Sequence, residues 1–241
     1  MKIEFNKTVK VDELAPLIPF KAGATFSQLW QIFLYTRMFK YVSRSHYPKI
    51  KSSFNKICTH KNLQKLCEMG YLKNPRQDVY CATNKVIPIL KETGYVTELL
   101  PQGAVGTGDI NELNNTDIFV QATKLKHFKM LLFPQFGYLI PDALLLQLDS
   151  DNNKYKLTFL EIEAQKPKWN NYVENKRDNY IRLSKELSFY NYWNTIAPKL
   201  DLPIPTIDKF KFNVTFICTL NKNFGNGFKM VPQISHINEM E

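Results

Sequence analysis

The sequence has little that would mark a secreted, membrane-embedded or zinc-binding protein. Its 4 cysteines form no CxxC pair and its 4 histidines form no HExxH motif. No stretch reaches the roughly 18 to 20 uninterrupted apolar residues of a membrane helix, and the chain opens without a basic segment followed by an apolar one. We therefore expect a cytoplasmic protein with free thiols and no membrane partner.

Basic residues are present in excess, and they are unevenly distributed. The formal net charge is +10; residues 1–110 carry 16 Lys and Arg against 8 Asp and Glu, whereas residues 111–241 carry 16 against 14. Between Arg37 and Lys85 there are 11 basic residues and 2 acidic ones. An excess of this kind favours an anionic partner such as nucleic acid. We therefore expect the first half to contact that partner.

The first half alternates helical patterns with one hairpin. Helices are expected from Thr25, within residues 47–57, from Thr59 to Gly70 and over residues 84–93, with a hairpin over residues 71–83. Thr59 is a suitable N-cap and Gly70 a suitable helix terminator. This order resembles a winged helix-turn-helix.

In winged-helix families the third helix enters the major groove and the wing reaches the backbone. The resemblance therefore implies contacts to double-stranded DNA. The residues that would make them are His60, Lys61, Asn62, Gln64 and Lys65 on the helix, and Lys73 and Arg76 on the wing. The alternative is that these side chains form only a solvated basic face.

A glycine-containing stretch, residues 99–115, predicts a linker between a domain of residues 1–98 and a domain of residues 116–241. Its GAVGTG segment is not followed by the Lys-Ser/Thr pair of a phosphate-binding loop. Residues 116–133 are expected to form a helix beginning at Thr116, and Asp117 in its first turn is a weaker candidate for an extra acidic group.

Two apolar strands joined by a polar turn are expected at residues 139–148 and 155–164. Because side chains alternate along a strand, Glu161, Glu163 and Gln165 share one face. Asp142 interrupts the apolar run of the first strand. Crowded carboxylates beside a core are costly unless a cation compensates, and oxygen ligands suit Mg²⁺. The pattern therefore predicts a metal site.

Downstream, residues 169–193 are expected to be helical, in one piece or two, and residues 210–219 to form a further strand. Pro141-Asp142 and Glu161-Ile162-Glu163, with 19 residues from Asp142 to Glu161, resemble the signature of the PD-(D/E)xK nuclease superfamily. Glu163 stands where that signature usually has lysine. With the leading winged helix, the chain looks closest to the replication-relaxation proteins of plasmids and mobile elements.

The resemblance implies an α/β (α+β) fold, with a winged helix followed by a restriction-endonuclease-like mixed sheet flanked by helices. It further implies a Mg²⁺- or Mn²⁺-dependent DNA endonuclease, with Asp142 and Glu161 as ligands and Glu163 as a third ligand or a base for water. Gln165 would position that water or hydrogen-bond the phosphate, and Lys176 would supply the missing positive charge. A catalytically inactive DNA-binding relative is the alternative. A homodimer and other mobile-element proteins stay open as partners.

An EF-hand reading of Asp149, Asp151 and Asn153 fails, because Lys154 and Leu160 occupy the positions that require glycine and glutamate. These residues fit a hairpin turn instead.

Overall fold

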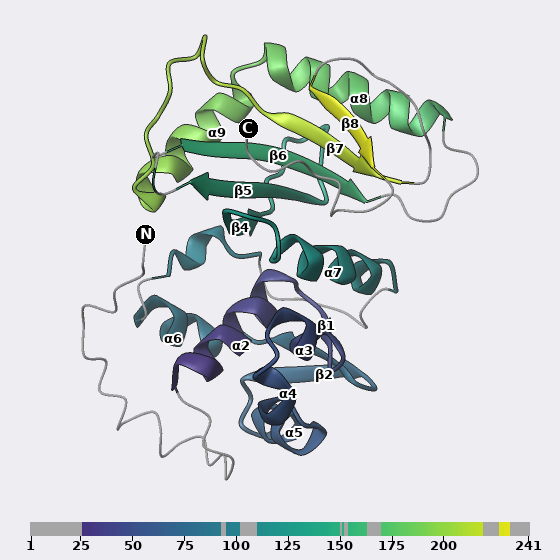
Figure 1. The fold of residues 1–241 in the computed structure, drawn as a ribbon, viewed down its shortest axis with the longest axis vertical. Coiled ribbons are helices and arrows are strands. Elements are labelled where there is room, and N and C mark those ends of the chain that lie inside the picture. The colour runs from purple at the N-terminus through teal and green to yellow at the C-terminus, as the bar shows by residue number, and fades with distance from the viewer. Residues whose placement is uncertain are drawn as a thin grey trace. The chain divides into compact units, whose positions relative to one another are not determined.

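The computed structural model describes residues 26–92, 95–101, 110–149, 151, 154–162, 170–218 and 227–231. The chain divides into two compact units, Met1–Val120 and Gln121–Glu241. Both are mixtures of helices and strands, so the expected α+β class is confirmed. Each unit is described below by itself (Figure 1).

The first unit contains short helices around a small antiparallel sheet with strand order β1-β3-β2. Its elements are α2 (Phe26–Met38), β1 (Val42–Ser43), α3 (His46–Ile50), α4 (Phe54–Ile57), α5 (His60–Glu68), β2 (Leu72–Arg76), β3 (Val79–Ala82), α6 (Val86–Glu92), the 3-10 turn η2 (Thr97–Leu99) and α7 (Ile110–Ala122).

The core of this unit is built on α2, whose side chains Leu29, Phe33 and Met38 are buried at helical spacing. The Phe33 ring packs 5.3 Å from that of Tyr71. On the same helix the Thr36 hydroxyl donates to the Ile32 carbonyl and lies 2.9 Å from the Tyr47 hydroxyl. These contacts join α2 to α3 and to the start of the hairpin.

Helix α5 begins and ends where the sequence predicts. The Thr59 side chain accepts a hydrogen bond from the Asn62 backbone N–H at 3.3 Å, which satisfies one of the free donors of the first turn. Gly70 follows the helix with a φ of +76°, a backbone conformation that side chains with a Cβ disfavour. Leu63 and Leu66 are buried, so the opposite face of α5 is left to solvent.

The middle of the chain differs from expectation. Helix α7 ends at Ala122, and Phe128–Leu132 forms strand β4 rather than the end of a helix over residues 116–133. His127 has a φ of +61°, which a continuous helix cannot contain. Met130, Leu131 and Leu132 are all buried, and a short run of consecutive apolar residues fits a helix or a buried strand equally well.

Helix α7 also packs within the first unit. The Thr116 hydroxyl donates to the Tyr41 carbonyl at 2.6 Å, and the Phe119 ring lies 6.0 Å from that of Phe39. Residues 110–115 of the expected linker are helical, and residues 102–109 lie outside the described residues. The two units meet in sequence at Val120 and Gln121, later than the expected linker.

The second unit is a mixed five-stranded sheet with two helices packed on it. Its elements are β4 (Phe128–Leu132), β5 (Ala143–Asp149), β6 (Lys154–Ile162), α8 (Asn170–Lys185), α9 (Ser188–Ile196), the 3-10 turn η3 (Ala197–Leu200), β7 (Asn213–Ile217) and β8 (Phe228–Val231). The strand order is β4-β5-β6-β7-β8; β4, β5 and β6 pair antiparallel, and β7 and β8 continue parallel to β6.

Helices α8 and α9 supply the crossover that a parallel connection between β6 and β7 requires (Figure 1). The Phe159 ring of β6 lies 5.1 Å from Tyr180 on α8 and 4.8 Å from Phe189 on α9. Both helices therefore cover the sheet face that carries Phe159. Because side chains alternate along a strand, Glu161 projects from that same face.

The sequence predicted most of these elements, with three further differences. The helix expected within residues 47–57 is split into α3 and α4, and strands β1 and β8 were not expected. Strand β1 contains two residues, too few for any periodic pattern. The expected helix over residues 169–193 is the pair α8 and α9.

Candidate functional site

Two acidic residues of the second unit come together where β5 begins and β6 ends. In the antiparallel register Ala143 pairs with Leu160, so Asp142 and Glu161 occupy the next position along the two strands. The Asp142 carboxylate accepts a hydrogen bond from the Ile162 backbone N–H at 2.7 Å through Oδ2. This bond holds the Asp142 side chain against the end of β6.

Glu161 is fully buried, yet both of its carboxylate oxygens have partners. Tyr180 donates its hydroxyl to Oε1 at 2.6 Å, and the Lys176 ammonium group donates to Oε2. Residues four apart on a helix lie on one face, which is why α8 presents Lys176 and Tyr180 together. A buried carboxylate without such donors would be strongly disfavoured.

The electrostatics of this cluster are dominated by burial. Burial raises the pKa of Glu161 to about 7; the Lys176 charge opposes this rise and the Asp142 charge adds to it. Burial alone would lower the pKa of Lys176, but the Glu161 and Asp142 carboxylates raise it above its usual range. Lys176 is therefore a fixed cation, whereas Glu161 changes its charge near neutral pH.

One side of the cluster is open to solvent. Tyr172, one turn before Lys176 on α8, is 45% exposed, and the Lys176 ammonium lies 5.1 Å from the centroid of its ring. Ile140, two residues before Asp142, is 63% exposed. Ile140 and Tyr172 therefore leave some apolar surface exposed near this cluster.

Of the site residues predicted from sequence, the structure brings together Asp142, Glu161 and Lys176. Glu163 and Gln165 lie outside the described residues. Tyr180 was not among the predicted site residues. The sequence could have indicated it, because Tyr180 follows Lys176 by four residues. Residues four apart on a helix lie on the same face, so the phenol can reach the same partner as the lysine.

The donor chemistry fits a hard divalent cation. Asp142 and Glu161 offer carboxylate oxygens from adjacent strand ends, the ligand type that Mg²⁺ and Mn²⁺ take. Within the described ranges no group of three or more His, Cys, Asp or Glu side chains is placed to hold a metal. The described part of the chain therefore supplies two carboxylates of such a site.

Asp117, the weaker acidic candidate, is part of the packing of the first unit. Its carboxylate lies 2.9 Å from the Lys49 ammonium and 3.2 Å from Nε2 of His46. These contacts hold α7 to α3, so they account for Asp117 without a catalytic role.

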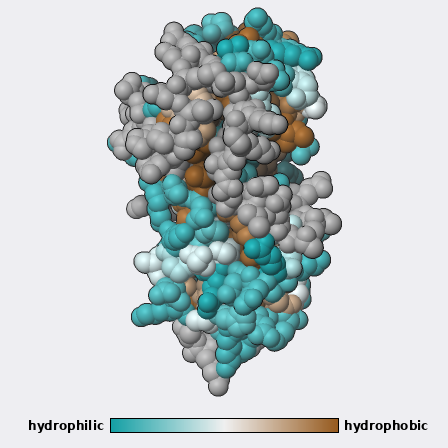
Figure 2. Space-filling model, turned by 90° about the vertical axis from the view of Figure 1, so that its right-hand side faces the viewer, coloured by the Kyte–Doolittle hydropathy of each residue, from teal (hydrophilic) through white to brown (hydrophobic). Residues whose placement is uncertain are grey.

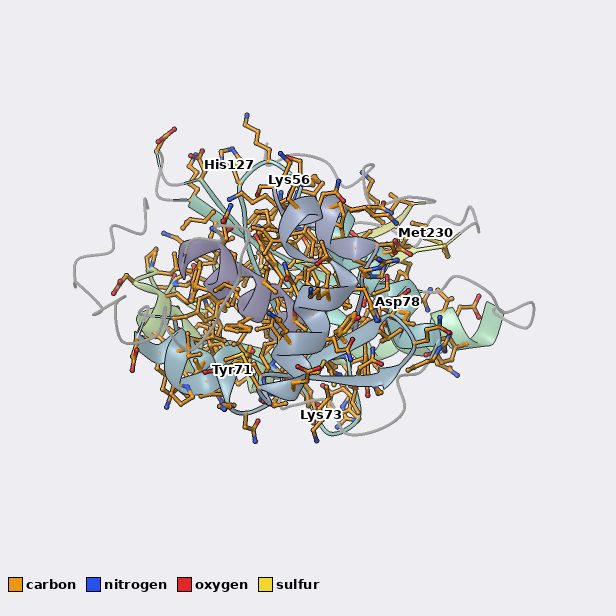
Figure 3. The ribbon with its side chains drawn as sticks, turned by 90° about the horizontal axis from the view of Figure 1, so that it is seen from below. Lys56, Tyr71, Lys73, Asp78, His127 and Met230 are labelled. Carbon is orange, nitrogen blue, oxygen red and sulfur yellow. The ribbon has the colours of Figure 1, made fainter. Side chains whose placement is uncertain are left out.

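The predicted DNA-contacting residues lie on α5 and β2 of the first unit. His60, Lys61, Gln64, Lys73 and Arg76 are exposed, and Asn62 and Lys65 are half-buried. Figure 3 labels Lys73, which points outward from β2, and Asp78, which lies at the hairpin turn.

Two of these residues also have local partners. The Asn62 amide donates to the Ile57 carbonyl at 2.8 Å. Nδ1 of His60 lies 3.5 Å from the Asp78 carboxylate, as does Nε of Arg44. Asp78 therefore ties the hairpin turn to the start of α5, and Lys61, Gln64, Lys65, Lys73 and Arg76 remain the better candidates for contacts to a ligand.

Among the described residues on the face drawn in Figure 2, most are hydrophilic and the apolar ones form small patches. No helix among the described residues has the length and apolarity that crossing a membrane requires.

Comparison with protein-family models, with curated proteins and with solved structures gives no match. Any function must therefore be argued from the site itself.

Proposed function

We propose that this protein processes DNA, with a second unit that hydrolyses phosphodiester bonds with Mg²⁺ or Mn²⁺ and a first unit that binds duplex DNA. The observation that carries the proposal is the meeting of Asp142 and the buried Glu161 with a lysine from α8. Strand-end carboxylates beside a fixed cation are the groups that phosphodiester hydrolysis uses.

The order of elements in the second unit supports the proposal. Strands β5 and β6 pair antiparallel, a helical crossover follows, and β7 pairs parallel to β6. This is the order that the resemblance to the PD-(D/E)xK superfamily implies. The lysine absent from position 163 has a counterpart in Lys176, whose ammonium reaches the Glu161 carboxylate from the helix.

The residues of the chain have distinct roles in this proposal. Asp142 and Glu161 would hold the cation, and a bound cation would supply acidification of a water molecule and neutralisation of charge on the phosphate. Tyr180 fixes the orientation of Glu161 through its hydrogen bond to Oε1. Lys176 stabilises the negative charge that builds on the phosphate. Glu163 and Gln165 are proposed to hold the metal and to position the attacking water.

The first unit supports the duplex-binding part of the proposal. Helix α5 and the β2–β3 hairpin follow one another as the third helix and wing of a winged helix do, and both carry exposed basic residues. In this arrangement the α5 side chains enter the major groove and Lys73 and Arg76 contact phosphates. The resemblance to replication-relaxation proteins extends the proposal to plasmid or mobile-element DNA.

A second candidate function is DNA binding without cleavage. It is favoured by the engagement of both Glu161 oxygens by Tyr180 and Lys176, and by Glu163 in the place of the usual lysine. In that case the Glu161–Lys176 pair serves only to hold α8 on the sheet.

A nicking assay separates the two candidates. Supercoiled plasmid is incubated with the full chain in Mg²⁺, Mn²⁺ or EDTA, using wild type, Asp142→Asn and the control Asp208→Asn, which changes an exposed acid elsewhere in the unit. Metal-dependent nicking that is lost in Asp142→Asn and kept in Asp208→Asn supports the nuclease. DNA binding without nicking in any metal supports the inactive binder.

A further inference from the structure

The second unit contains a cavity of about 480 Å³ that shares one lining residue, Tyr180, with the cluster around Glu161. It is bounded by the C-terminal half of α8, the beginning of α9, Ile207, residues 210–212 and the first residues of β7 and β8. This volume is within the range of about 300–1,000 Å³ that is usual for ligand pockets.

Aromatic rings form much of the cavity wall. Tyr190, Phe210, Phe212 and Phe228 line it and are each partly exposed. The Phe210 ring packs 5.0 Å from that of Phe189 and 5.4 Å from that of Tyr190, whose hydroxyl donates to the Pro205 carbonyl at 3.2 Å. The rings are therefore held in place by their neighbours and offer preformed surfaces for a flat ligand.

The charge around the cavity is positive. Lys185 and Lys211 line it and are exposed. The acidic residue of the lining, Glu186, is engaged by Arg182 at 2.6 Å and by the Tyr138 hydroxyl at 2.8 Å. The two lysines consequently favour an anionic ligand at the cavity mouth.

The cavity mouth also exposes apolar surface. Leu187 and Ile207 are each 53% exposed, and both line the cavity. They belong to the five large apolar side chains that are exposed in the described part of the chain. Apolar side chains gathered at a cavity are typical of a binding site rather than of ordinary solvent-facing surface.

We infer that this cavity binds an unpaired nucleotide of single-stranded DNA. The base stacks on the aromatic wall, and the phosphates on either side of it pair with Lys185 and Lys211. Stacking on aromatic rings beside basic residues is how proteins bind single strands without reading their sequence. The choice of DNA as the ligand rests on the proposed function.

The inference also narrows the substrate class. Tyr180 lines the cavity, and its hydroxyl donates to the Glu161 carboxylate. Tyr180 itself is fully buried, so a strand bound in the cavity lies near α8, the helix that orients a proposed metal ligand. The substrate expected from this arrangement is duplex DNA that carries a single-stranded segment, rather than an uninterrupted duplex.

Photo-crosslinking tests the inference directly. The full chain in EDTA is irradiated with an oligodeoxythymidylate containing 5-iododeoxyuridine, and the labelled peptides are identified by mass spectrometry. We expect label on Tyr190 or within residues 207–213. Label confined to other segments would overturn the inference. That result is also the one expected if the cavity binds an apolar peptide instead of DNA.

Charge variants provide the quantitative arm, because Lys185→Glu and Lys211→Glu change exposed side chains and are expected to leave the melting temperature unchanged. Lys209→Glu, an exposed lysine outside the lining, is the matched control. We expect the Lys185→Glu/Lys211→Glu double variant to bind the oligonucleotide at least tenfold more weakly than Lys209→Glu does and to lose the crosslink. Equal affinity of the two would contradict the inference.

The nicking assay on plasmid separates this inference from the proposed function. Nicking without a crosslink in the cavity would support the proposed nuclease and contradict the single-strand site. A crosslink in the cavity without nicking would support the single-strand site and contradict the nuclease.

Discussion

At the scale of single residues, the second unit depends on how Glu161 is held. Burial raises the pKa of its carboxyl, and the hydrogen bonds from Tyr180 and Lys176, two donors on one helix, oppose that rise. A carboxylate whose pKa is raised to about 7 changes protonation within the physiological range. Metal binding requires the deprotonated form, so pH controls the proposed site through this residue.

Replacing Tyr180 by Phe tests this control. The Tyr180 hydrogen bond lowers the pKa of Glu161, so its loss raises that pKa further above 7. Metal binding by the wild type is expected to rise as pH increases through about 7, and in Tyr180→Phe the same rise should occur at higher pH. Calorimetric titration of Mn²⁺ between pH 6 and 9 measures both curves.

Tyr138→Phe is the matched control, because it removes a phenol that hydrogen-bonds a different carboxylate, that of Glu186, in the same unit. An unshifted curve for Tyr180→Phe would show that Glu161 does not govern metal binding.

Replacing Lys176 by Met tests the buried ion pair. Without the ammonium the charged form of Glu161 is less stable, so its folded-state pKa rises further above the unfolded value. A group with a raised folded pKa loses stability as pH rises through that pKa. We expect Lys176→Met to lower the free energy of unfolding by about 3 kcal/mol at pH 8 and by less at pH 6.

Urea unfolding at the two pH values measures this difference. Adding Glu161→Gln to Lys176→Met removes the buried charge and should restore much of the stability lost at pH 8. If Lys176→Met lost the same free energy of unfolding at pH 6 and pH 8, the Glu161–Lys176 ion pair would not be the cause of the loss.

At the scale of elements, α5 shows what local sequence can determine. Its N-cap, its terminating glycine and its two faces were all predictable, because each depends on residues within one or two turns. The strand partners of Asp142 and Glu161 were also predictable, since an apolar run, a polar turn and a second apolar run favour a hairpin.

Other elements could not be predicted in this way. Strand β4 has buried residues at consecutive positions, which removes the alternation that distinguishes strand from helix. Part of helix α7 was predicted, from Thr116 onward, but Thr116 and Asp117 contact Tyr41 and Lys49, partners about 70 positions away in sequence that no local pattern reveals. The pairing of Lys176 and Tyr180 with Glu161 likewise depends on how α8 packs on the sheet.

The exposed face of α5 carries the prediction for DNA binding. Changing Lys61 and Lys65 to Ala removes two cations that the proposal places near phosphates. Each phosphate contact contributes about 0.9 to the slope of log affinity against log salt concentration, so the slope should flatten by about 2. Fluorescence anisotropy with a duplex between 50 and 200 mM salt measures it.

Lys91→Ala, which alters an exposed lysine of α6, is the control. A double variant with the slope and affinity of Lys91→Ala would remove α5 from the proposed duplex-binding surface.

The contact between α7 and α3 provides a prediction for the stability of the first unit. Burial lowers the pKa of His46, which is neutral in the folded unit, whereas Asp117 partly offsets this effect. A histidine with a depressed folded pKa contributes stability above its unfolded pKa of about 6.5, and that stability is lost as pH falls through the folded pKa. Unfolding followed by tryptophan fluorescence should therefore show lower stability at pH 5 than at pH 7.

In His46→Gln the glutamine side chain does not titrate, so the difference in stability between pH 5 and pH 7 should be smaller than in the wild type. If it retained the pH dependence of the wild type, other groups would be responsible.

At the scale of the whole molecule, charge and chemistry are divided between two compact units. The first half carries the basic excess together with α5 and its hairpin, and the second carries the acidic cluster and the aromatic cavity. In the proposed function, the basic unit would increase the local concentration of DNA for the unit proposed to act on phosphates. A variant that loses the proposed DNA binding of the first unit should therefore keep the proposed chemistry of the second, and the reverse. The two properties can be measured separately.

The central claim is that Asp142, Glu161 and Lys176 form a metal-dependent phosphodiester-cleaving site. The most direct test is nicking of supercoiled DNA in Mn²⁺ by wild type and Glu161→Gln, prepared identically and compared with EDTA samples. Gln retains the shape of Glu161 and an acceptor for Tyr180 but removes the charge. The account predicts metal-dependent nicking by the wild type and at least a hundredfold slower nicking by Glu161→Gln; equal nicking by the two proteins, or none by the wild type, would contradict it.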